Sequence, residues 1–204
     1  MDVSNHVNQS IYRLWAPVYD FLFRSVSAAS RKRAIGLLCL KPGESLMIPG
    51  VGTGLDLPLL PEGLVVTGLD YSLAMLARVR MKAINDCTLL LYGNAAQLPV
   101  RTGSVDAVLF SLVLSVVPDP IQTFREGWRI LRPGGRVAIF DKFQPEASQL
   151  TTRRMLIGTF IRTLGTDPNR KLGEICAGIP DIRVVHDLPD LLNGQYRVVL
   201  LKKG

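Results

Sequence analysis

The sequence predicts a single α/β domain with a seven-stranded, mostly parallel sheet and helices on both of its faces. Three observations predict this fold class. Between Lys41 and Phe143, short β-branched runs alternate with longer helical patterns, which is typical of βαβ units. Three closely spaced glycines, Gly50, Gly52 and Gly54, directly follow the first strand-like run. Finally, 204 residues of which 48% are hydrophobic can close one sizeable core, and the usual size of domains argues against two.

The first half of the sheet follows from local pattern. We expect strand one at Ser45 to Pro49 and strand two at Leu64 to Asp70, with a Pro-Glu-Gly turn just before strand two. Ser72 is a typical helix N-cap, and the helix that it opens should run to about Ala83. Strand three is predicted at Thr88 to Tyr92.

The second half of the sheet begins with Val105 to Leu114, which is apolar enough to form a fourth strand buried on both faces. Asp119 and Pro120 are expected to open the next helix. The segment Leu131 to Gly135 should break that helix, so that strand five follows at Arg136 to Phe140.

The tail adds two strand-like runs, and two helical pieces lie outside the sheet. Ile182 to Val185 and Tyr196 to Leu201 should be strands six and seven, joined by a turn at Asn193-Gly194. The helical pieces are expected at Asn8 to Leu38, before the sheet, and at Ala147 to about Ala177, after strand five. Both pieces are apolar and basic together.

Composition limits the partners and the compartment. The chain carries 24 Lys and Arg against 17 Asp and Glu, and its net charge of +7 favours an acidic partner such as anionic lipid or nucleic acid, although an ordinary surface excess fits equally well. No window approaches the roughly 18 apolar residues of a membrane-spanning helix, and the polar start carries no signal pattern, so we expect a cytoplasmic protein. Cys39, Cys87 and Cys176 are far apart, which indicates buried thiols rather than disulfides or a metal site.

The glycine loop in SLMIPGVGTGLD (Ser45 to Asp56) can present backbone N–H groups to a ligand. The dinucleotide fingerprint Gly-x-Gly-x-x-Gly does not fit, because the sixth position counted from Gly50 is Leu55. A phosphate-binding P-loop needs Lys-Ser/Thr after its last glycine, and here Leu55-Asp56 follows Gly54 instead. The loop therefore favours a ligand without phosphate groups.

Gly-x-Gly-x-Gly after strand one, together with an acidic residue at the end of strand two, resembles the S-adenosylmethionine loop of class I methyltransferases, whose fold is Rossmann-like. This resemblance implies an antiparallel last strand and an N-terminal helical cap. The loop carries no cationic side chain, in keeping with an uncharged ribose and a methionine zwitterion. Asp70 lies where a carboxylate can accept hydrogen bonds from both ribose hydroxyls, and its alternative role is that of a helix N-cap.

Further segments resemble the same family. Gly93 to Pro99 is similar to its Gly-Asp-Ala-x-x-Leu-Pro loop, and Asn94 in place of the acid can still accept from an adenine amino group and donate to a ring nitrogen. Ser104 to Leu114 and Leu131 to Gly135 resemble the fourth-strand motif and the Leu-Arg-Pro-Gly-Gly turn. The resemblance implies S-adenosyl-L-methionine as cofactor, S-adenosyl-L-homocysteine as product, and these cofactor-binding residues: Gly50, Val51, Gly52, Gly54, Asp70, Tyr71, Asn94, Ala95 and Ser111.

Two segments, Tyr12 to Asp20 and Ser115 to Pro120, resemble bacterial phosphatidylethanolamine N-methyltransferases and their relatives among the quinone-biosynthesis C-methyltransferases. Tyr12 and Tyr19 are accordingly catalytic candidates, with aromatic packing of a cap helix as the alternative. The chain then divides into an N-terminal helical cap (1–40), a cofactor-binding core (41–143), a helical substrate lid (144–180) and a C-terminal strand pair (181–204).

The chemistry needs few catalytic groups, because displacement at a sulfonium mainly requires an in-line nucleophile and exclusion of water. For an amine acceptor, Tyr12, Tyr19 or Asp141 could take the proton. Lys142, at the end of strand five, is the third catalytic candidate and could hold a lipid phosphate.

Apolar side chains border basic ones in both helical pieces, as in helices that lie on an anionic bilayer. The cations after the first apolar stripe are Arg24, Arg31, Lys32 and Arg33. Ordinary packing of these helices on the sheet is the alternative. We therefore expect N-methylation of phosphatidylethanolamine or a related lipid headgroup at the inner face of the membrane, with two alternatives left open: methylation of a soluble thiol or quinone precursor, and a non-catalytic cofactor-binding module.

A nucleic-acid substrate is not expected, since no Asn/Asp-Pro-Pro-Tyr/Phe-like motif follows strand four. One position departs from the family pattern: Ile48 stands where the usual loop has Glu or Asp, two residues before Gly50. Stiffness at Pro49 is one substitute for that acid. Asp56 is the nearest remaining carboxylate that could meet the cofactor's ammonium group, or else an ordinary helix-start acid.

Overall fold

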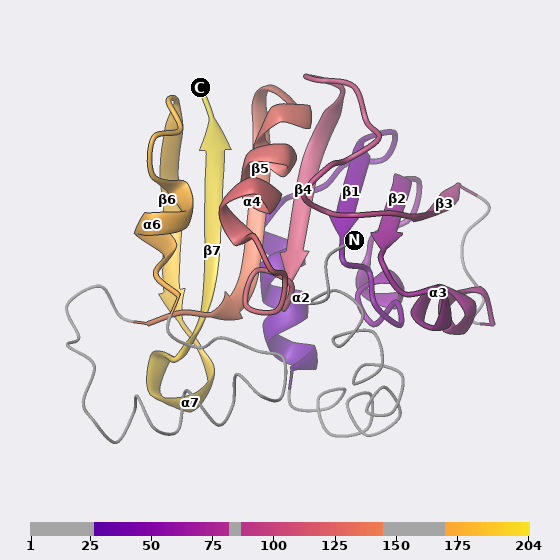
Figure 1. Cartoon of the computed structure of the whole chain (residues 1–204), viewed down its shortest axis with the longest axis horizontal. Coiled ribbons are helices and arrows are strands. Elements are labelled where there is room, and N and C mark those ends of the chain that lie inside the picture. The colour runs from indigo at the N-terminus through magenta and orange to yellow at the C-terminus, as the bar shows by residue number, and fades with distance from the viewer. Residues whose placement is uncertain (1–26, 82–86, 145–169) are drawn as a thin grey trace.

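A computed structural model of the chain describes residues 27–81, 87–144 and 170–204. Its strands form one sheet in the order β3-β2-β1-β4-β5-β7-β6 (Figure 1). The strands are β1 (Ser45–Pro49), β2 (Val65–Asp70), β3 (Thr88–Tyr92), β4 (Val105–Ser111), β5 (Leu131–Lys142), β6 (Ile182–Pro189) and β7 (Tyr196–Lys203). The helices are α2 (Ala28–Leu37), α3 (Leu73–Arg80), α4 (Pro120–Ile130), α6 (Leu172–Cys176) and α7 (Leu191–Gly194), with a 3₁₀ turn η1 (Leu57–Leu59).

The strand directions confirm the predicted fold class. The pairs β1–β2, β2–β3, β1–β4 and β4–β5 are parallel, whereas β7 runs antiparallel to both β5 and β6. The strand order reverses between β1 and β4, so the loops that leave these two strands diverge. In open α/β sheets a ligand binds in the crevice that such a reversal creates at the carboxyl ends of the strands.

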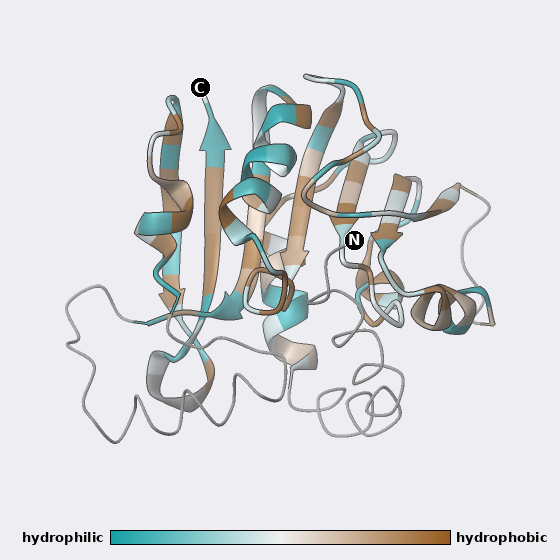
Figure 2. Cartoon of the chain, viewed as in Figure 1, coloured by the Kyte–Doolittle hydropathy of each residue, from teal (hydrophilic) through white to brown (hydrophobic). Residues whose placement is uncertain are grey.

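Each face of the sheet has its own apolar layer. On one face α4 packs Phe124 and Trp128 against the sheet, and on the other α2 contributes Ala34 and Ile35. Alternate residues of β5 enter the two layers, Val137 and Ile139 one and Ala138 and Phe140 the other, as the period of a strand requires. Figure 2 shows the result: the central strands β1, β4 and β7 are mostly apolar, and α4 carries polar residues on the side toward the viewer.

Two predicted strand boundaries were wrong, because contacts with neighbouring strands and not the local pattern set where β4 ends and β5 begins. β4 ends at Ser111 and not at Leu114, since Leu112 takes a φ of +56° while its N–H bonds the Phe140 carbonyl at 2.8 Å. β5 begins at Leu131, five residues before the predicted Arg136, where it pairs with Val105 ahead of a register shift.

The connection between β6 and β7 also differs from the prediction. In place of a two-residue turn, β6 runs on to Pro189 and the short helix α7 follows, ending at Gly194 with a φ of +80°. The expectation of buried thiols was wrong for Cys39 and Cys87, which are exposed because they lie in connections outside the sheet.

The predicted helical pieces lie mostly outside the described residues, which contain only α2 and α6 of them. The division into cap, core, lid and strand pair therefore stays a prediction. Within residues 27–81, 87–144 and 170–204, no helix is long and apolar enough to cross a membrane. The same residues hold no group of three or more His, Cys, Asp or Glu that could bind a metal ion.

Candidate functional site

The glycine loop lies at the carboxyl end of β1, beside the point where the strand order reverses. Its first residues are fixed by the sheet, since the Gly50 and Val51 N–H groups donate to the Leu69 carbonyl at 2.7 and 2.9 Å. Gly50 has a φ of +71°, and a Cβ added to it would lie 2.5 Å from Cγ2 of Val113. By contrast, a Cβ added to Gly52 would meet no atom of the described residues within 4 Å. The loop is therefore tightly packed at Gly50 and open at Gly52.

Asp70, the last residue of β2, holds this loop in place. Its Oδ2 accepts the Gly52 N–H at 2.8 Å and its Oδ1 accepts the Ser72 N–H at 2.9 Å. Burial raises the pKa of the Asp70 carboxyl, and the backbone hydrogen bonds oppose that shift. The N-cap of α3 is Ser72, whose Oγ accepts from Met75, so capping is not the role of Asp70. A third backbone hydrogen bond comes from Tyr71, so the carboxylate, with about four acceptor sites, keeps one for a ligand hydroxyl.

Tyr71 and Asn94 lie next to Asp70 at the same edge of the sheet. Tyr71 is 40% exposed and stacks on Tyr92 with ring centroids 5.6 Å apart, so the two rings form an exposed aromatic surface. Asn94 Oδ1 accepts the Ala96 N–H at 2.9 Å and thereby shapes the turn after β3. Ala95 is buried in this turn.

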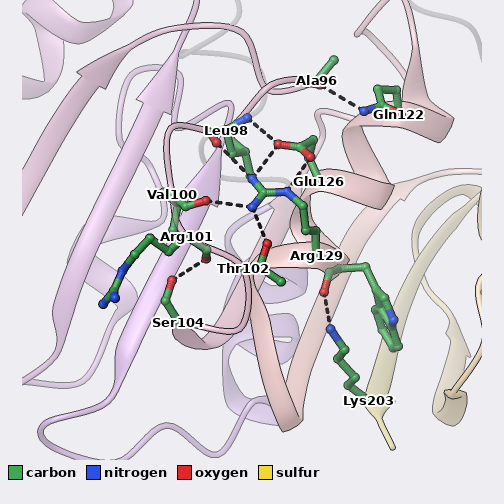
Figure 3. Close-up of polar contacts among 11 residues, drawn as sticks. Ala96, Leu98, Val100, Arg101, Thr102, Ser104, Gln122, Glu126, Arg129 and Lys203 are labelled. Atoms are coloured by element: carbon green, nitrogen blue, oxygen red, sulfur yellow. Dashed lines mark hydrogen bonds and ion pairs between the residues drawn. The ribbon is translucent and has the colours of Figure 1, made fainter.

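The loop that continues from this turn is clamped by α4 (Figure 3). Glu126 accepts the Leu98 N–H at 2.8 Å, and Arg129 donates to the carbonyls of Leu98 and Val100 at 3.1 and 3.0 Å. The two side chains also pair with each other at 2.7 Å, and the hydrogen bond from Arg129 lowers the pKa of Glu126. Residues 98–102 are thus fixed to the helix by charge-assisted bonds.

Ser111 ends β4 and joins a buried ion pair. Its Oγ accepts from Arg31 Nη1 at 2.8 Å and donates to Asp56 Oδ1 at 3.2 Å, and Arg31 and Asp56 form a salt bridge at 2.8 Å. The assignment of Arg31 to a bilayer-facing group of cations was wrong, because its side chain is 6% exposed and points into the protein. Asp56, considered from the sequence as a partner for a ligand ammonium or a helix-start acid, precedes only the short turn η1 and is bound to Arg31.

A second polar cluster lies at the carboxyl end of β5. Asp141 is completely buried, and it accepts the Ser115 N–H at 3.1 Å and the Lys142 N–H at 2.8 Å. Burial raises the pKa of Asp141. A carboxylate so enclosed fixes the loop after β4, and Arg170 supports the same loop by donating to the Leu114 and Val117 carbonyls.

Lys142 has its Nζ 5.6 Å from the centre of the Tyr196 ring, on the strand paired with β5. Burial lowers the pKa of Lys142, and the Asp141 carboxylate opposes the shift. Burial also raises the pKa of Tyr196 to about 12, with a contribution from Asp141. Sequence reasoning missed Tyr196, since only the antiparallel pairing of β7 with β5 places it opposite Lys142.

The structure therefore brings the predicted residues of the glycine loop, Asp70, Tyr71, Asn94, Ala95 and Ser111 to one edge of the sheet, with Lys142 at the same edge two strands from β1. Tyr12 and Tyr19 lie outside the described residues. Arg31 and Arg170 also lie beside this edge, although the sequence predicted a bilayer-facing role for Arg31 and no role for Arg170. Both are basic residues far from the glycine motif, so no sequence signal connected them with it.

Comparison with known proteins gives concordant results. Residues 48–139 match a family described as methyltransferase domain. The chain is 34% identical over 182 residues to a phosphatidylethanolamine N-methyltransferase of Cereibacter sphaeroides, covering 87% of this chain and 88% of that protein. It is 33% identical over 149 residues to a demethylmenaquinone methyltransferase of Listeria welshimeri, covering 66% and 62%. Among solved structures, a SAM-dependent methyltransferase of Thermotoga maritima superposes with a TM-score of 0.71 at 22% identity, covering 96% of this chain and 100% of that one.

Proposed function

We propose that this chain, which belongs to the family of S-adenosylmethionine-dependent methyltransferases, transfers the methyl group to the amine of phosphatidylethanolamine or a related lipid headgroup. Its enzymatic class and its cofactor follow from the family. The acceptor is the proposal, and one observation carries it: the match to the phosphatidylethanolamine N-methyltransferase spans nearly all of both chains. The match to the demethylmenaquinone methyltransferase ends at about two thirds of each.

The described residues fit this cofactor. The open centre of the loop at Gly52 leaves room for a bulky ligand, and the half-buried carboxylate of Asp70 has acceptor capacity left for a ribose hydroxyl. The exposed rings of Tyr71 and Tyr92 offer an apolar surface beside the adenine loop at Asn94. When bound, S-adenosylmethionine supplies an electrophilic methyl group on a positively charged sulfur.

The residues of the chain supply position rather than a catalytic triad. We assign Asp70 and the glycine loop to the cofactor and Lys142 to the phosphate of the lipid. Lys142 is partly buried at the carboxyl end of β5, where burial has removed some of its hydration and a phosphate oxygen would replace it. The face of the Tyr196 ring beside its ammonium group orients the side chain.

A proton must leave the acceptor amine before attack. Asp141 is completely enclosed, so its proposed part is to hold the loop after β4 and not to touch the substrate. Tyr12 and Tyr19 remain the proposed proton acceptors. Contact with the inner face of the membrane is proposed from the net charge of +7 and the basic apolar segments of the sequence.

The acceptor is tested by incubating the purified protein with methyl-labelled cofactor and vesicles of phosphatidylethanolamine and phosphatidylglycerol. Label in monomethylated phosphatidylethanolamine is the expected result. A parallel incubation with demethylmenaquinone in phosphatidylcholine vesicles tests the quinone alternative, and a soluble metabolite extract tests small thiols. Label confined to either of these would refute the lipid proposal.

The role of Lys142 is tested by Lys142→Met. Loss of a charged hydrogen bond worth about 1.5–3 kcal/mol should raise the KM for phosphatidylethanolamine vesicles roughly tenfold or more without changing the affinity for S-adenosylhomocysteine. Lys202→Met is the matched control, because Lys202 is exposed on β7 opposite Arg136, at the far end of the sheet. Equal KM values for the two variants would remove Lys142 from the site.

A further inference from the structure

Three segments of the chain meet in one buried polar cluster next to the glycine loop. Arg31 of α2 donates from Nη1 to both oxygens of Asp56, at 2.9 and 2.8 Å, and to the hydroxyl of Ser111 at 2.8 Å. Its Nε donates to Ser27 Oγ at 3.1 Å. The side chains of Arg31 and Asp56 are only 6% and 4% exposed. We call these four residues the Arg31 cluster.

The position of the Arg31 cluster is informative because two of its members, Asp56 and Ser111, lie at or next to predicted cofactor contacts. Asp56 is two residues after Gly54, and the turn between them is tight, since the Gly54 N–H bonds Val51 and the Leu57 N–H bonds Gly54. Ser111 is the last residue of β4 and is itself a predicted contact. Arg31 therefore ties the end of the glycine loop to the carboxyl end of the neighbouring strand.

Burial of this ion pair has no evident benefit for stability alone. Taking two charges out of water is costly, and well-packed apolar residues in place of a buried pair are often as stable or more so. The other ion pairs of the described residues are more exposed. At the opposite edge of the sheet, Arg136 of β5 pairs at 2.6 Å with Glu44, the residue before β1, and their side chains are 21% and 22% exposed. The Arg31–Asp56 pair differs from these pairs in that it is buried and joins the end of the glycine loop to the carboxyl end of β4.

Strand β1 supplies no carboxylate to the glycine loop, because Ile48 stands at the position where the usual loop has Glu or Asp. Ile48 is fully buried in the apolar layer that also contains Ala34 and Ile35 of α2. The loop is thus held from β2 through Asp70 and Gly52, and from α2 through Arg31 and Asp56. Asp70 thus holds the middle of the glycine loop, and Asp56 holds its end.

We infer that Arg31 is a positioning residue for the cofactor, which acts through Asp56 and Ser111 to set the spacing between the glycine loop and the carboxyl end of β4. The inference rests on the placement of S-adenosylmethionine on this loop, and it is independent of the acceptor. Lys cannot replace Arg here without loss, because a single ammonium group lacks the planar fork that reaches Asp56, Ser111 and Ser27 together.

The test measures binding of S-adenosylhomocysteine by titration calorimetry, with the thermal midpoint recorded for each protein. The double variant Arg31→Met/Asp56→Leu removes both charges together, so no unpaired charge is left buried. We expect it to keep the wild-type midpoint within a few degrees and to lose at least tenfold in affinity. In the methylation assay the KM for the cofactor should rise while kcat at saturation is retained.

The matched control is Arg136→Met/Glu44→Leu, which removes an ion pair of similar length at the opposite edge and should leave the affinity unchanged. If the double variant at the Arg31 cluster does not fold, Arg31→Lys replaces it, with an expected three- to tenfold loss. Wild-type affinity in a folded Arg31 variant would overturn the inference. Failure of the wild-type protein to bind S-adenosylhomocysteine would instead overturn the placement of the cofactor, and the two results are therefore distinct.

Discussion

The Asp70→Asn substitution separates binding from stability at the centre of the site. Asp70 accepts the backbone N–H groups of Gly52 and Ser72 through different oxygens. An asparagine of the same shape has one acceptor oxygen, and its amide nitrogen must face one of these donors. The variant therefore leaves either the glycine loop or the start of α3 without its acceptor.

The two expected magnitudes differ. For the ligand, replacing a carboxylate by a neutral amide removes a hydrogen bond to a charged group worth about 1.5–3 kcal/mol, which corresponds to roughly 10- to 150-fold in Kd. For folding, the lost backbone bond is partly offset, because burial raises the pKa of Asp70 and thus makes its ionised form costly. We expect the free energy of unfolding to change by less than about 1 kcal/mol.

Calorimetric titration with S-adenosylhomocysteine as a function of pH is the decisive measurement. Since the pKa of Asp70 in the free protein lies above its ordinary 3.8, affinity should fall as the pH drops towards that raised value, and the acid limb should vanish in Asp70→Asn. Asp106→Asn is the control, because Asp106 bonds Ser45 at the amino end of β4 and should affect stability only. Wild-type affinity in Asp70→Asn at neutral pH would refute the reasoning.

Two further predictions concern packing and the α4 clamp. Gly127→Ala should destabilise the protein by about 1 kcal/mol, since the new Cβ would lie 2.5 Å from Cζ of the buried Phe110. Gly36→Ala is the control and should stabilise the protein slightly, because its Cβ would meet none of the described atoms within 4 Å. A urea melt in which Gly36→Ala is the less stable of the two variants would contradict the packing. Glu126→Gln should cost about 1 kcal/mol. Because the pKa of Glu126 is lowered from 4.5, its contribution is complete above that pH and is lost as the pH falls further, so the thermal midpoints of variant and wild type should converge in acid; a constant difference would argue against the ion pair.

Much of the fold and part of the site could be predicted from the sequence because their signals are local. The bounds of β1 and β3 and the caps Ser72 and Asp119 agree with the structure, since turn residues and capping side chains act within a few positions. The spacing of the glycines and the acid at the end of strand two indicated the family, which the comparisons confirmed. A motif of this kind records the backbone shape that the ligand requires.

Only the tertiary structure decided which side chains contact the glycine loop and the neighbouring strand ends. Arg31 and Lys142 are both basic residues near apolar runs, and nothing local distinguishes the buried partner of Asp56 from the lysine beside the ring of Tyr196. Likewise Leu112 leaves β4 in a left-handed conformation while its N–H bonds the Phe140 carbonyl of the neighbouring strand. The physical reason is common to all of these cases. Local periodicity determines which face a residue occupies, whereas its partner is chosen by strand order and register, which join residues that are distant in the chain.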